Sequence, residues 1–263
     1  MRVFTKKSIT AFCALTMLSA SYAQETSNDI MLTNGIKFLG TPYVAHTLDT
    51  NATEELILNC DEVDCTTFIE YVLAESLCPV VNGDISEGTF AQKLQMIRYR
   101  DGKIDGYTSR LHYITDWINN GVRNGFLEDV TSEKSKETQV IQLSYMSSHP
   151  QAYNQLANSP QEVEKIRQIE KALSGQTIHY LPKNKLPYNG LSWIKNGDII
   201  AITTNIPGLD VAHMGLAFYA DGKLTLIHAS SSDGKVVAST TALSQMLKNN
   251  DNWTGIRVLR MKK

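Results

Sequence analysis

Residues 64–68 of the chain read Asp-Cys-Thr-Thr-Phe and open an apolar run that ends near Leu77. Asp64 is a good helix N-cap, because its carboxylate can accept a hydrogen bond from a backbone N–H of the first turn. Cys65 then occupies the first helical position, where free N–H groups and the helix dipole favour a negative charge. We therefore predict a helix beginning at Cys65 and a thiol with a lowered pKa. The alternative is that Cys65 is a small buried apolar residue, as most cysteines are.

The composition is that of an ordinary globular protein. The 263 residues are 42% hydrophobic and 20% charged, enough for a sizeable core in one large domain or two small ones. A formal net charge of −2 argues against a nucleic-acid-binding surface. We find no repeat or clean linker, and we expect residues 24–263 to form a single, monomeric domain with a helical elaboration at about 79–190.

The first residues have the pattern of a secretory signal peptide. Basic residues precede an apolar run at residues 9–20, and residues 21–23 read Ser-Tyr-Ala, a small-x-small cleavage site. We predict that residues 1–23 are removed and that the protein is exported to the periplasm or beyond. Cys13 follows the bulky Phe12, which does not suit a lipid-anchor site, and no later segment is long and apolar enough to span a membrane. We therefore expect no membrane anchor.

The predicted mature chain keeps three cysteines, Cys60, Cys65 and Cys78, and an odd count leaves at least one thiol unpaired. Cys60 and Cys78 lie near opposite ends of a predicted helix about 20 Å long, whereas a disulfide needs Cα atoms within about 7 Å. Pairing of Cys60 with Cys65 is geometrically possible but would consume the candidate nucleophile. A free thiol in an oxidising compartment favours a catalytic role.

The periodicity predicts helices first and strands later. Helices are expected at residues 28–40, 65–77, 90–99 and 161–173, and a short strand or turn at 56–58. Strands are expected at residues 198–202, 211–220, 223–229, 235–238 and 256–261. Asp221-Gly222 is a strong signal for a two-residue hairpin loop between the second and third strands.

This hairpin predicts that two histidines share one face. With a two-residue loop, Ala220 faces Lys223 and His228 faces Gly215. Because side chains alternate along a strand, His213 lies on the face of Gly215 and is a diagonal neighbour of His228. A three-residue loop would send His228 to the opposite face.

We expect the Cys65 helix to pack on this same face, since Gly215 and Ala217 are small enough to allow a close approach. Cys65 would then lie near His213 with His228 behind it, which is the order of nucleophile, base and orienting group in cysteine amidases. A lone histidine on a strand is more often structural. Zinc is another use of one cysteine and two histidines, but a fourth ligand is not evident and the spacing matches no common finger.

Several segments resemble, in order, the signature of the NlpC-type, papain-like bacterial cell-wall cysteine peptidases. They are residues 64–68, Gly197-Asp198, residues 213–216 (His-Met-Gly-Leu) and residues 228–230 (His-Ala-Ser). Within that superfamily the chain is similar to the muramoyl-alanine amidase branch, and this resemblance covers nearly the whole mature chain. The supporting segments are residues 38–44 (FLGTPYV), residues 109–113, Asp116-Trp117 and residues 208–210.

The resemblance implies an α+β fold with a papain-like core, in which the N-terminal catalytic helix packs on an antiparallel sheet, with a large helical insertion. It also implies hydrolysis of the amide between N-acetylmuramic acid and L-alanine in peptidoglycan or muropeptides. Cys65 is then the nucleophile, His213 the general base and His228 the residue that orients it. No metal or organic cofactor is required.

Further site residues follow from the resemblance. Tyr43 and Asp64 flank the nucleophile, and the backbone N–H of Cys65 is suited to an oxyanion hole. Aromatic rings stack on sugars and an arginine pairs with carboxylates, so a second patch is a candidate for substrate binding. It consists of Ser109, Arg110, His112 and Tyr113. A packed aromatic helix is an equally good reading of Tyr113.

Two other functions fit the same residues. A peptidase that cuts the γ-D-glutamyl bond within the stem peptide would use the same triad and differ only in its pocket. A peptidoglycan-binding protein without activity would keep the fold but have no need of a reactive thiol.

Overall fold

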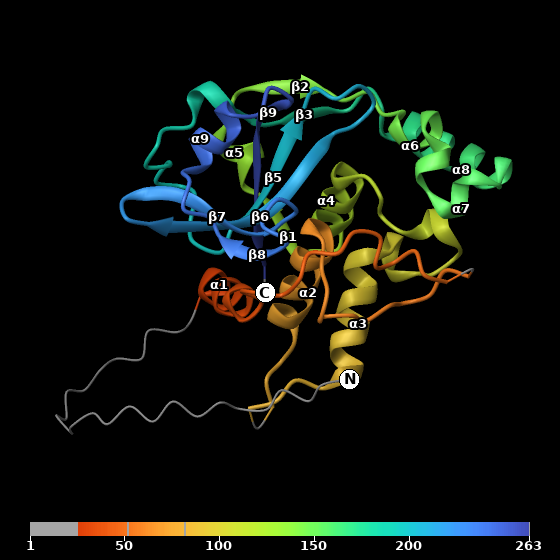
Figure 1. Cartoon of the computed structure of the whole chain (residues 1–263), viewed down its shortest axis with the longest axis horizontal. Helices are drawn as coiled ribbons and strands as arrows, with labels where there is room; N and C mark the ends of the chain where they lie inside the picture. Colours follow the sequence, from red (N-terminus) through yellow and green to blue (C-terminus); the bar gives the residue numbers. More distant parts are fainter. Residues whose placement is uncertain (1–25, 52, 82, 263) are drawn as a thin grey trace.

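The computed structural model of the protein describes residues 26–51, 53–81 and 83–262, so the predicted signal peptide lies outside the described residues. Within them, an antiparallel sheet has the strand order β1-β9-β5-β6-β7-β8, and β4 also pairs with β9 (Figure 1). The strands of this sheet are β1 (Leu127–Asp129), β4 (Leu181–Pro182), β5 (Ile199–Thr204), β6 (Val211–Ala220), β7 (Lys223–Ser230), β8 (Lys235–Ala238) and β9 (Trp253–Met261). The protein therefore has a mixed α+β fold.

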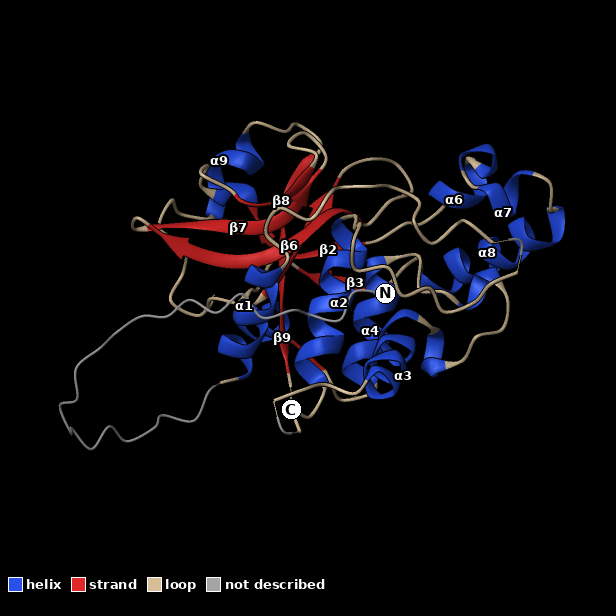
Figure 2. Ribbon diagram, turned by 60° about the horizontal axis from the view of Figure 1, so that its bottom comes forward, coloured by secondary structure: helices blue, strands red, loops and turns tan. Residues whose placement is uncertain are grey.

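Helices cover both faces of the sheet (Figure 2). One hydrophobic core joins the sheet to α1 (Ser27–Lys37), α2 (Cys65–Leu77), α3 (Glu87–Arg98) and α4 (Ile114–Arg123). A second core, on the opposite face, includes side chains of α5 (Val130–Lys134) and α9 (Leu243–Lys248).

A third core lies at one end of the molecule, around three helices (Figures 1 and 2). These are α6 (Tyr145–Ser148), α7 (Asn154–Ala157) and α8 (Pro160–Leu173), and the small sheet of β2 (Thr138–Val140) and β3 (Thr177–His179) joins them. Short 3-10 turns complete the chain at Arg100–Gly102, Tyr107–Ser109, Pro150–Ala152 and Lys183–Lys185.

Helix α2 begins at the predicted residue. The Asp64 carboxylate accepts hydrogen bonds from the N–H groups of Thr66 at 2.9 Å and Thr67 at 2.8 Å, and the Thr67 hydroxyl in return accepts the N–H of Asp64 at 2.8 Å. This reciprocal capping box satisfies three donors that a helix start otherwise leaves unpaired. The helix ends at Leu77, before Pro79, as predicted.

The hairpin of β6 and β7 also has the predicted register. Asp221 and Gly222 both have positive φ, 51° and 72°, which suits a two-residue turn of the mirror-image type. Ala220 pairs with Lys223, and the pairing continues to Leu216 and Ile227. A Cβ added at Gly215 would lie 3.0 Å from the Cβ of His228, so these two residues are opposed as predicted.

The prediction that α2 packs on the face of His213 is wrong. Helix α2 shares a core with Met214, Leu216 and Ile227, whereas Ala217, next to Gly215 on the histidine face, belongs to the second core. A long apolar helix gains more from covering large side chains than from a close approach to small ones. Because Gly215 has no side chain, the Cβ of His228 occupies the space beside it.

A buried ion pair links α2 to α3. The Nε of Arg98 donates to the Glu70 carboxylate at 2.6 Å, and its Nη1 donates to the carbonyl of Ile57 at 2.7 Å. Both charged side chains are almost inaccessible, with 1% of Arg98 and 3% of Glu70 exposed. Residues 56–58, predicted as a strand or turn, instead run without regular structure and supply this carbonyl.

Candidate active site

Cys65 lies half-buried at the first position of α2. The N–H groups of Thr66 and Thr67 are used by the Asp64 cap, but the N–H of Cys65 itself is not part of that cap. A helix N-terminus with a free N–H favours negative charge close to it. Cys60, Cys65 and Cys78 are all free thiols, so Cys65 is unpaired, as the odd cysteine count allowed.

The Cys65 sulfur meets the sheet where β6 and β7 separate. The N–H of Ala217 donates toward β5, to the carbonyl of Asp198 at 2.8 Å, so alternation directs the N–H of Met214 toward β7. The ladder between β6 and β7 stops at Leu216 and Ile227, before Met214 is reached. The N–H of Met214 is thus free of the ladder, and it lies close enough to the sulfur of Cys65 to lower the pKa of that thiol.

His213 and His228 form a hydrogen-bonded pair across the same opening. The Nε2 of His213 lies 2.8 Å from the Nδ1 of His228, and the two rings are nearly perpendicular at 89°. His213 directly precedes Met214, whose N–H contacts the thiol. The structure therefore brings His213 and His228 into contact and places Cys65 beside Met214, the residue that follows His213. The Met214 N–H was not predicted, because only the end of the β6–β7 ladder exposes it.

The prediction of a lowered thiol pKa is wrong. Burial, followed by the negative charge of Asp64, raises the pKa of Cys65 to about 11. Burial and the neighbouring His228 lower the pKa of His213 to about 3. Desolvation penalises whichever form carries the charge, and here it outweighs the helix dipole. The resting site therefore holds a neutral thiol and a neutral imidazole.

Tyr43 lies near Cys65 and Asp64. A bridge between Tyr43 and Val63 brings the two ends of the intervening loop together, and the N–H of Val44 donates to the carbonyl of Val63 at 3.0 Å. Burial raises the pKa of Tyr43, and the proximity of Cys65 and Asp64 raises it further, so its hydroxyl is within electrostatic range of both. Its phenol can serve as a hydrogen-bond donor at the site.

Most polar groups of the predicted substrate patch make internal hydrogen bonds. The Ser109 hydroxyl donates to the carbonyl of Gly106 at 2.7 Å, and the Tyr113 hydroxyl donates to the Glu170 carboxylate at 2.7 Å. The Nε2 of His112 lies 2.9 Å from the carbonyl of Tyr107. Binding substrate through Ser109 or Tyr113 would require these bonds to break, so their role stays a prediction.

Arg110 forms ion pairs with two residues of the loop that connects Tyr43 to Cys65. Its Nη2 donates to Asp49 at 3.0 Å and to Glu54 at 2.9 Å, and its guanidinium lies over the ring of Tyr107. The buried Nε of Arg110 has no partner among the described residues. This arginine therefore pairs with carboxylates of its own chain, and a substrate carboxylate would have to compete with them.

The strand that carries His213 is fixed just before the histidine. The Asp210 carboxylate accepts the N–H of Thr115, in the first turn of α4, at 2.6 Å and that of Val211 at 2.9 Å. The carbonyl of Gly208 accepts the N–H groups of Ser144 and Tyr145, both at 3.1 Å. These bonds tie the start of β6 to two helices.

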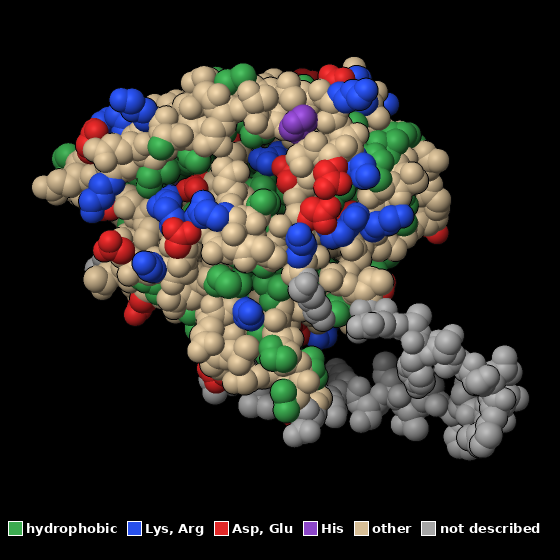
Figure 3. All heavy atoms as spheres, turned by 180° about the vertical axis from the view of Figure 1, so that it is seen from behind, with side chains coloured by type: hydrophobic (Ala, Val, Ile, Leu, Met, Phe, Trp, Pro, Cys, Tyr) green, Lys and Arg blue, Asp and Glu red, His purple; other side chains and the backbone are tan. Residues whose placement is uncertain are grey.

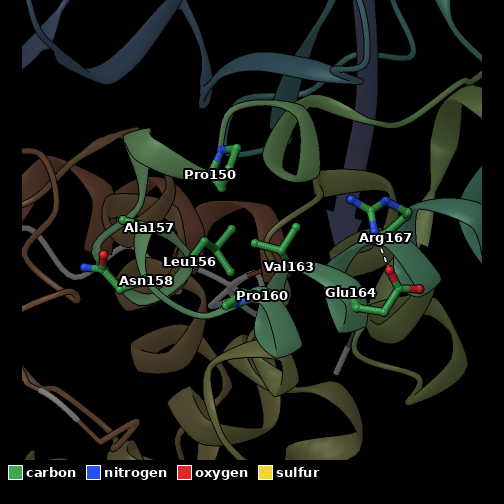
Figure 4. A pocket seen from close by; sticks show the side chains of 8 residues that line it. All are labelled: Pro150, Leu156, Ala157, Asn158, Pro160, Val163, Glu164 and Arg167. Atoms are coloured by element: carbon green, nitrogen blue, oxygen red, sulfur yellow. Dashed lines mark hydrogen bonds and ion pairs between the residues drawn. The ribbon is translucent and has the colours of Figure 1, made fainter.

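A pocket of about 620 Å³ lies away from these residues, among α7, α8 and the turn before α7 (Figure 4). Leu156 and Val163 line it, and the ion pair of Glu164 with Arg167 lies at one side (Figure 4). Its lining shares no residue with the thiol and histidine site. On the face seen in Figure 3, acidic and basic side chains are interspersed, in keeping with the small net charge.

The described residues contain no group of three or more histidine, cysteine, aspartate or glutamate side chains arranged to hold a metal ion. In the same part of the chain, every helix is too short or too polar to cross a membrane.

Three histidines with lowered pKa values predict that stability falls at acidic pH. Burial lowers the pKa of His112 and of His213 from 6.5 to about 3, and it also lowers the pKa of His228. Below pH 6.5 the unfolded chain binds protons that the folded protein excludes, so the free energy of unfolding decreases as pH falls. Within this window His112 and His213 each contribute up to about 1.4 kcal/mol per pH unit, and His228 acts in the same direction.

Denaturant unfolding between pH 7 and pH 4 measures this dependence. The slope should be shallower in a His112→Gln variant, whose side chain cannot be protonated. An equally steep slope in that variant would show that His112 has no part in the effect.

Comparisons with known proteins give consistent results. A model of the AmiA-like family, described as N-acetylmuramoyl-L-alanine amidase-like, matches residues 33–256. The crystal structure of an N-acetylmuramoyl-L-alanine amidase from Bacteroides uniformis is 71% identical with a TM-score of 0.88, covering 89% of this chain and 99% of that one. A Bacteroides fragilis structure, described as a candidate xylanase, is 64% identical with a TM-score of 0.86, covering 88% and 100%.

A more distant structure, from Legionella pneumophila, is 23% identical with a TM-score of 0.67, covering 90% of this chain and 89% of that one. It shows a shared fold. A search of curated proteins finds no match.

Proposed function

Because this chain belongs to the AmiA-like family of N-acetylmuramoyl-L-alanine amidase-like proteins, we propose that it cleaves the N-acetylmuramoyl–L-alanine amide of peptidoglycan fragments with a Cys-His-His triad. The observation that supports this most directly is the approach of the Cys65 thiol to β6, the strand of His213, together with the hydrogen bond between His213 and His228 of β7. Glycosidases commonly use two carboxylates, whereas this site presents a thiol and two imidazoles, which favours an amidase over a xylanase. The fold is then papain-like, of the NlpC type, with residues 79–190 as its helical insertion.

We also propose that residues 1–23 direct export and that residues 24–263 act as one domain. The substrate, peptidoglycan, is found outside the cytoplasmic membrane, which agrees with the pattern of basic and apolar residues at the N-terminus.

The first chemical step makes the acyl-enzyme. The Cys65 thiol transfers its proton to His213 as the sulfur attacks the lactyl carbonyl carbon, so a C–S bond forms and the carbonyl oxygen becomes an oxyanion. The N–H of Cys65 and the hydroxyl of Tyr43 are the proposed oxyanion donors. Collapse of the intermediate breaks the C–N bond, and His213 returns the proton to the departing amine of L-alanine.

The second step releases the muramic acid. Water gives a proton to His213 and attacks the thioester carbonyl, and the C–S bond breaks as the sulfur regains a proton. Because the pKa of the thiol is raised, the negative charge on sulfur arises only in the first step, when Cys65 gives its proton to His213. The Met214 N–H then stabilises the new charge on sulfur.

His228 sets the protonation state of His213. The Nε2 of His213 is used in the bond to His228, which leaves Nδ1 as the nitrogen able to accept the thiol proton. For Nδ1 to be free, Nε2 must carry the proton and donate it to the Nδ1 of His228. His228 therefore selects the tautomer and fixes the direction of the ring, the role of the third member of such triads.

Digestion of defined muropeptides tests the proposed bond. Incubation followed by mass spectrometry should release a free stem peptide beginning at L-alanine together with the muramic acid sugar. Release of an L-alanyl-D-glutamate dipeptide or its glycosylated form would instead identify a γ-D-glutamyl peptidase. Intact substrate that nevertheless co-migrates with the protein would identify a binding protein, and either result rejects the amidase proposal.

A further inference from the structure

A tryptophan at the start of β9 stacks on the proposed base. The rings of His213 and Trp253 are nearly parallel, at 8°, with centroids 5.9 Å apart. His228 contacts the same imidazole at its edge, with the rings at 89°. His228 therefore bonds a nitrogen in the plane of the His213 ring, whereas Trp253 stacks against its face.

This contact joins strands that are not neighbours. Strand β5 lies between β6 and β9, so two residues on those outer strands would be roughly 10 Å apart at the backbone. The register of β5 shifts against β6 between Ile202 and Thr203, and it shifts against β9 between Thr203 and Thr204. Bulges change the direction of nearby side chains, and here one lies beside each ring.

The bulge beside Trp253 is held by a specific bond. The hydroxyls of Thr203 and Thr254 are 2.8 Å apart, and Thr203 is fully buried. Thr203 pairs with Gly255 and Thr204 pairs with Trp253, so Thr254 is the extra residue of β9 and has no partner in β5. The bond between Thr203 and Thr254 thus fixes the backbone next to the indole within the sheet, and the N–H of Trp253 also donates to the carbonyl of Asn250 at 3.2 Å.

We propose that Trp253 is a positioning residue for catalysis, which holds the ring of His213 in the plane that lets Nε2 bond to His228 and Nδ1 face the thiol. This inference rests on the proposed function. Without the indole, the imidazole is free to rotate about its side-chain bonds, and the bond to His228 loses its alignment. The indole face also favours the imidazolium that forms during the reaction, because a cation over an aromatic ring is stabilised.

The test compares Trp253→Leu, which removes the aromatic face, with Trp253→Phe, which retains one. The matched control is Trp193→Leu, because Trp193 is another half-buried tryptophan that packs on the same core as Trp253. We expect Trp253→Leu to lower kcat about tenfold with KM unchanged, and Trp253→Phe to recover most of that loss. The control should keep kcat within about twofold of the parent protein.

A second readout requires no substrate. Long-range ¹H–¹⁵N spectra of the histidines distinguish the two neutral tautomers, and the parent protein should show His213 as a single Nε2–H form. Trp253→Leu should give an averaged pattern for His213, while Trp193→Leu should leave its signals in place. These spectra test the positioning even if the protein proves not to cleave muropeptides.

Three results would overturn the inference. They are an unchanged kcat in Trp253→Leu, a loss confined to KM, and a His213 signal that keeps the parent tautomer. If Trp253→Leu does not fold, Trp253→Met replaces it, because methionine fills more of the volume of the indole and carries no aromatic face. A kcat of Trp253→Met within about twofold of the parent, with an unshifted His213 signal, also rejects the proposal.

Discussion

Replacing Cys65 with alanine is expected to lower amidase turnover by at least about 10⁴-fold, because removing the nucleophile of such a triad leaves only binding and oxyanion stabilisation. The fold should be almost unaffected. The Asp64 cap bonds to the N–H groups of Thr66 and Thr67, so it stays intact when the side chain at position 65 changes. The free energy of unfolding should change by less than about 1 kcal/mol.

Cys60→Ala is the matched control for this variant. Cys60 is also a half-buried free thiol, and burial raises its pKa to about 11 as well. It should keep parental turnover, because it takes no part in the proposed chemistry. Product formation from a muropeptide and chemical denaturation, measured on both variants, separate activity from stability. Residual turnover in Cys65→Ala within tenfold of the parent would rule out the thiol as nucleophile.

Replacing Arg98 with methionine is expected to destabilise the protein by about 3–5 kcal/mol, the usual cost of leaving one member of a buried ion pair without its partner. The change strands the Glu70 carboxylate between α2 and α3 and also removes the donor to the carbonyl of Ile57. Methionine fills a similar volume, so the loss reports the charge and not a cavity.

Two controls define the cause. In the double variant Arg98→Met with Glu70→Leu, most of the lost stability should return, because no charge stays buried. Arg123→Met should cost less than about 1 kcal/mol, since Arg123 and Asp101 form a pair in which both side chains are about half exposed. Urea unfolding of the four proteins measures these differences. A double variant no more stable than Arg98→Met would mean that packing dominates.

Local signals in the sequence predicted much of the site. The cap and the apolar stripe fix where α2 begins and ends, and the Asp221-Gly222 turn fixes which residues of β6 and β7 face each other. Both depend on interactions within a few residues, which is why they can be read from sequence alone. The opposition of Gly215 and His228 followed from that register.

Features that depend on contacts between distant parts of the chain could not be predicted in this way. Which face of the sheet α2 covers depends on the total apolar area available on each side, and α2 covers Leu216 and not Gly215. The neighbours of β9 are set by the whole sheet, so nothing near Trp253 in the sequence indicates that it stacks on His213. The raised pKa of Cys65 likewise depends on burial by segments distant in the chain.

The neutral resting state of Cys65 has a consequence for the lifetime of the protein. Peroxides and other oxidants react with thiolates far faster than with thiols, and a sulfinic or sulfonic product is generally irreversible. A sulfur whose pKa is about 11 exists almost entirely as thiol at neutral pH. Under the proposed mechanism, Cys65 is thus held between turnovers in a form that resists oxidation, and the reactive anion exists only while His213 holds its proton.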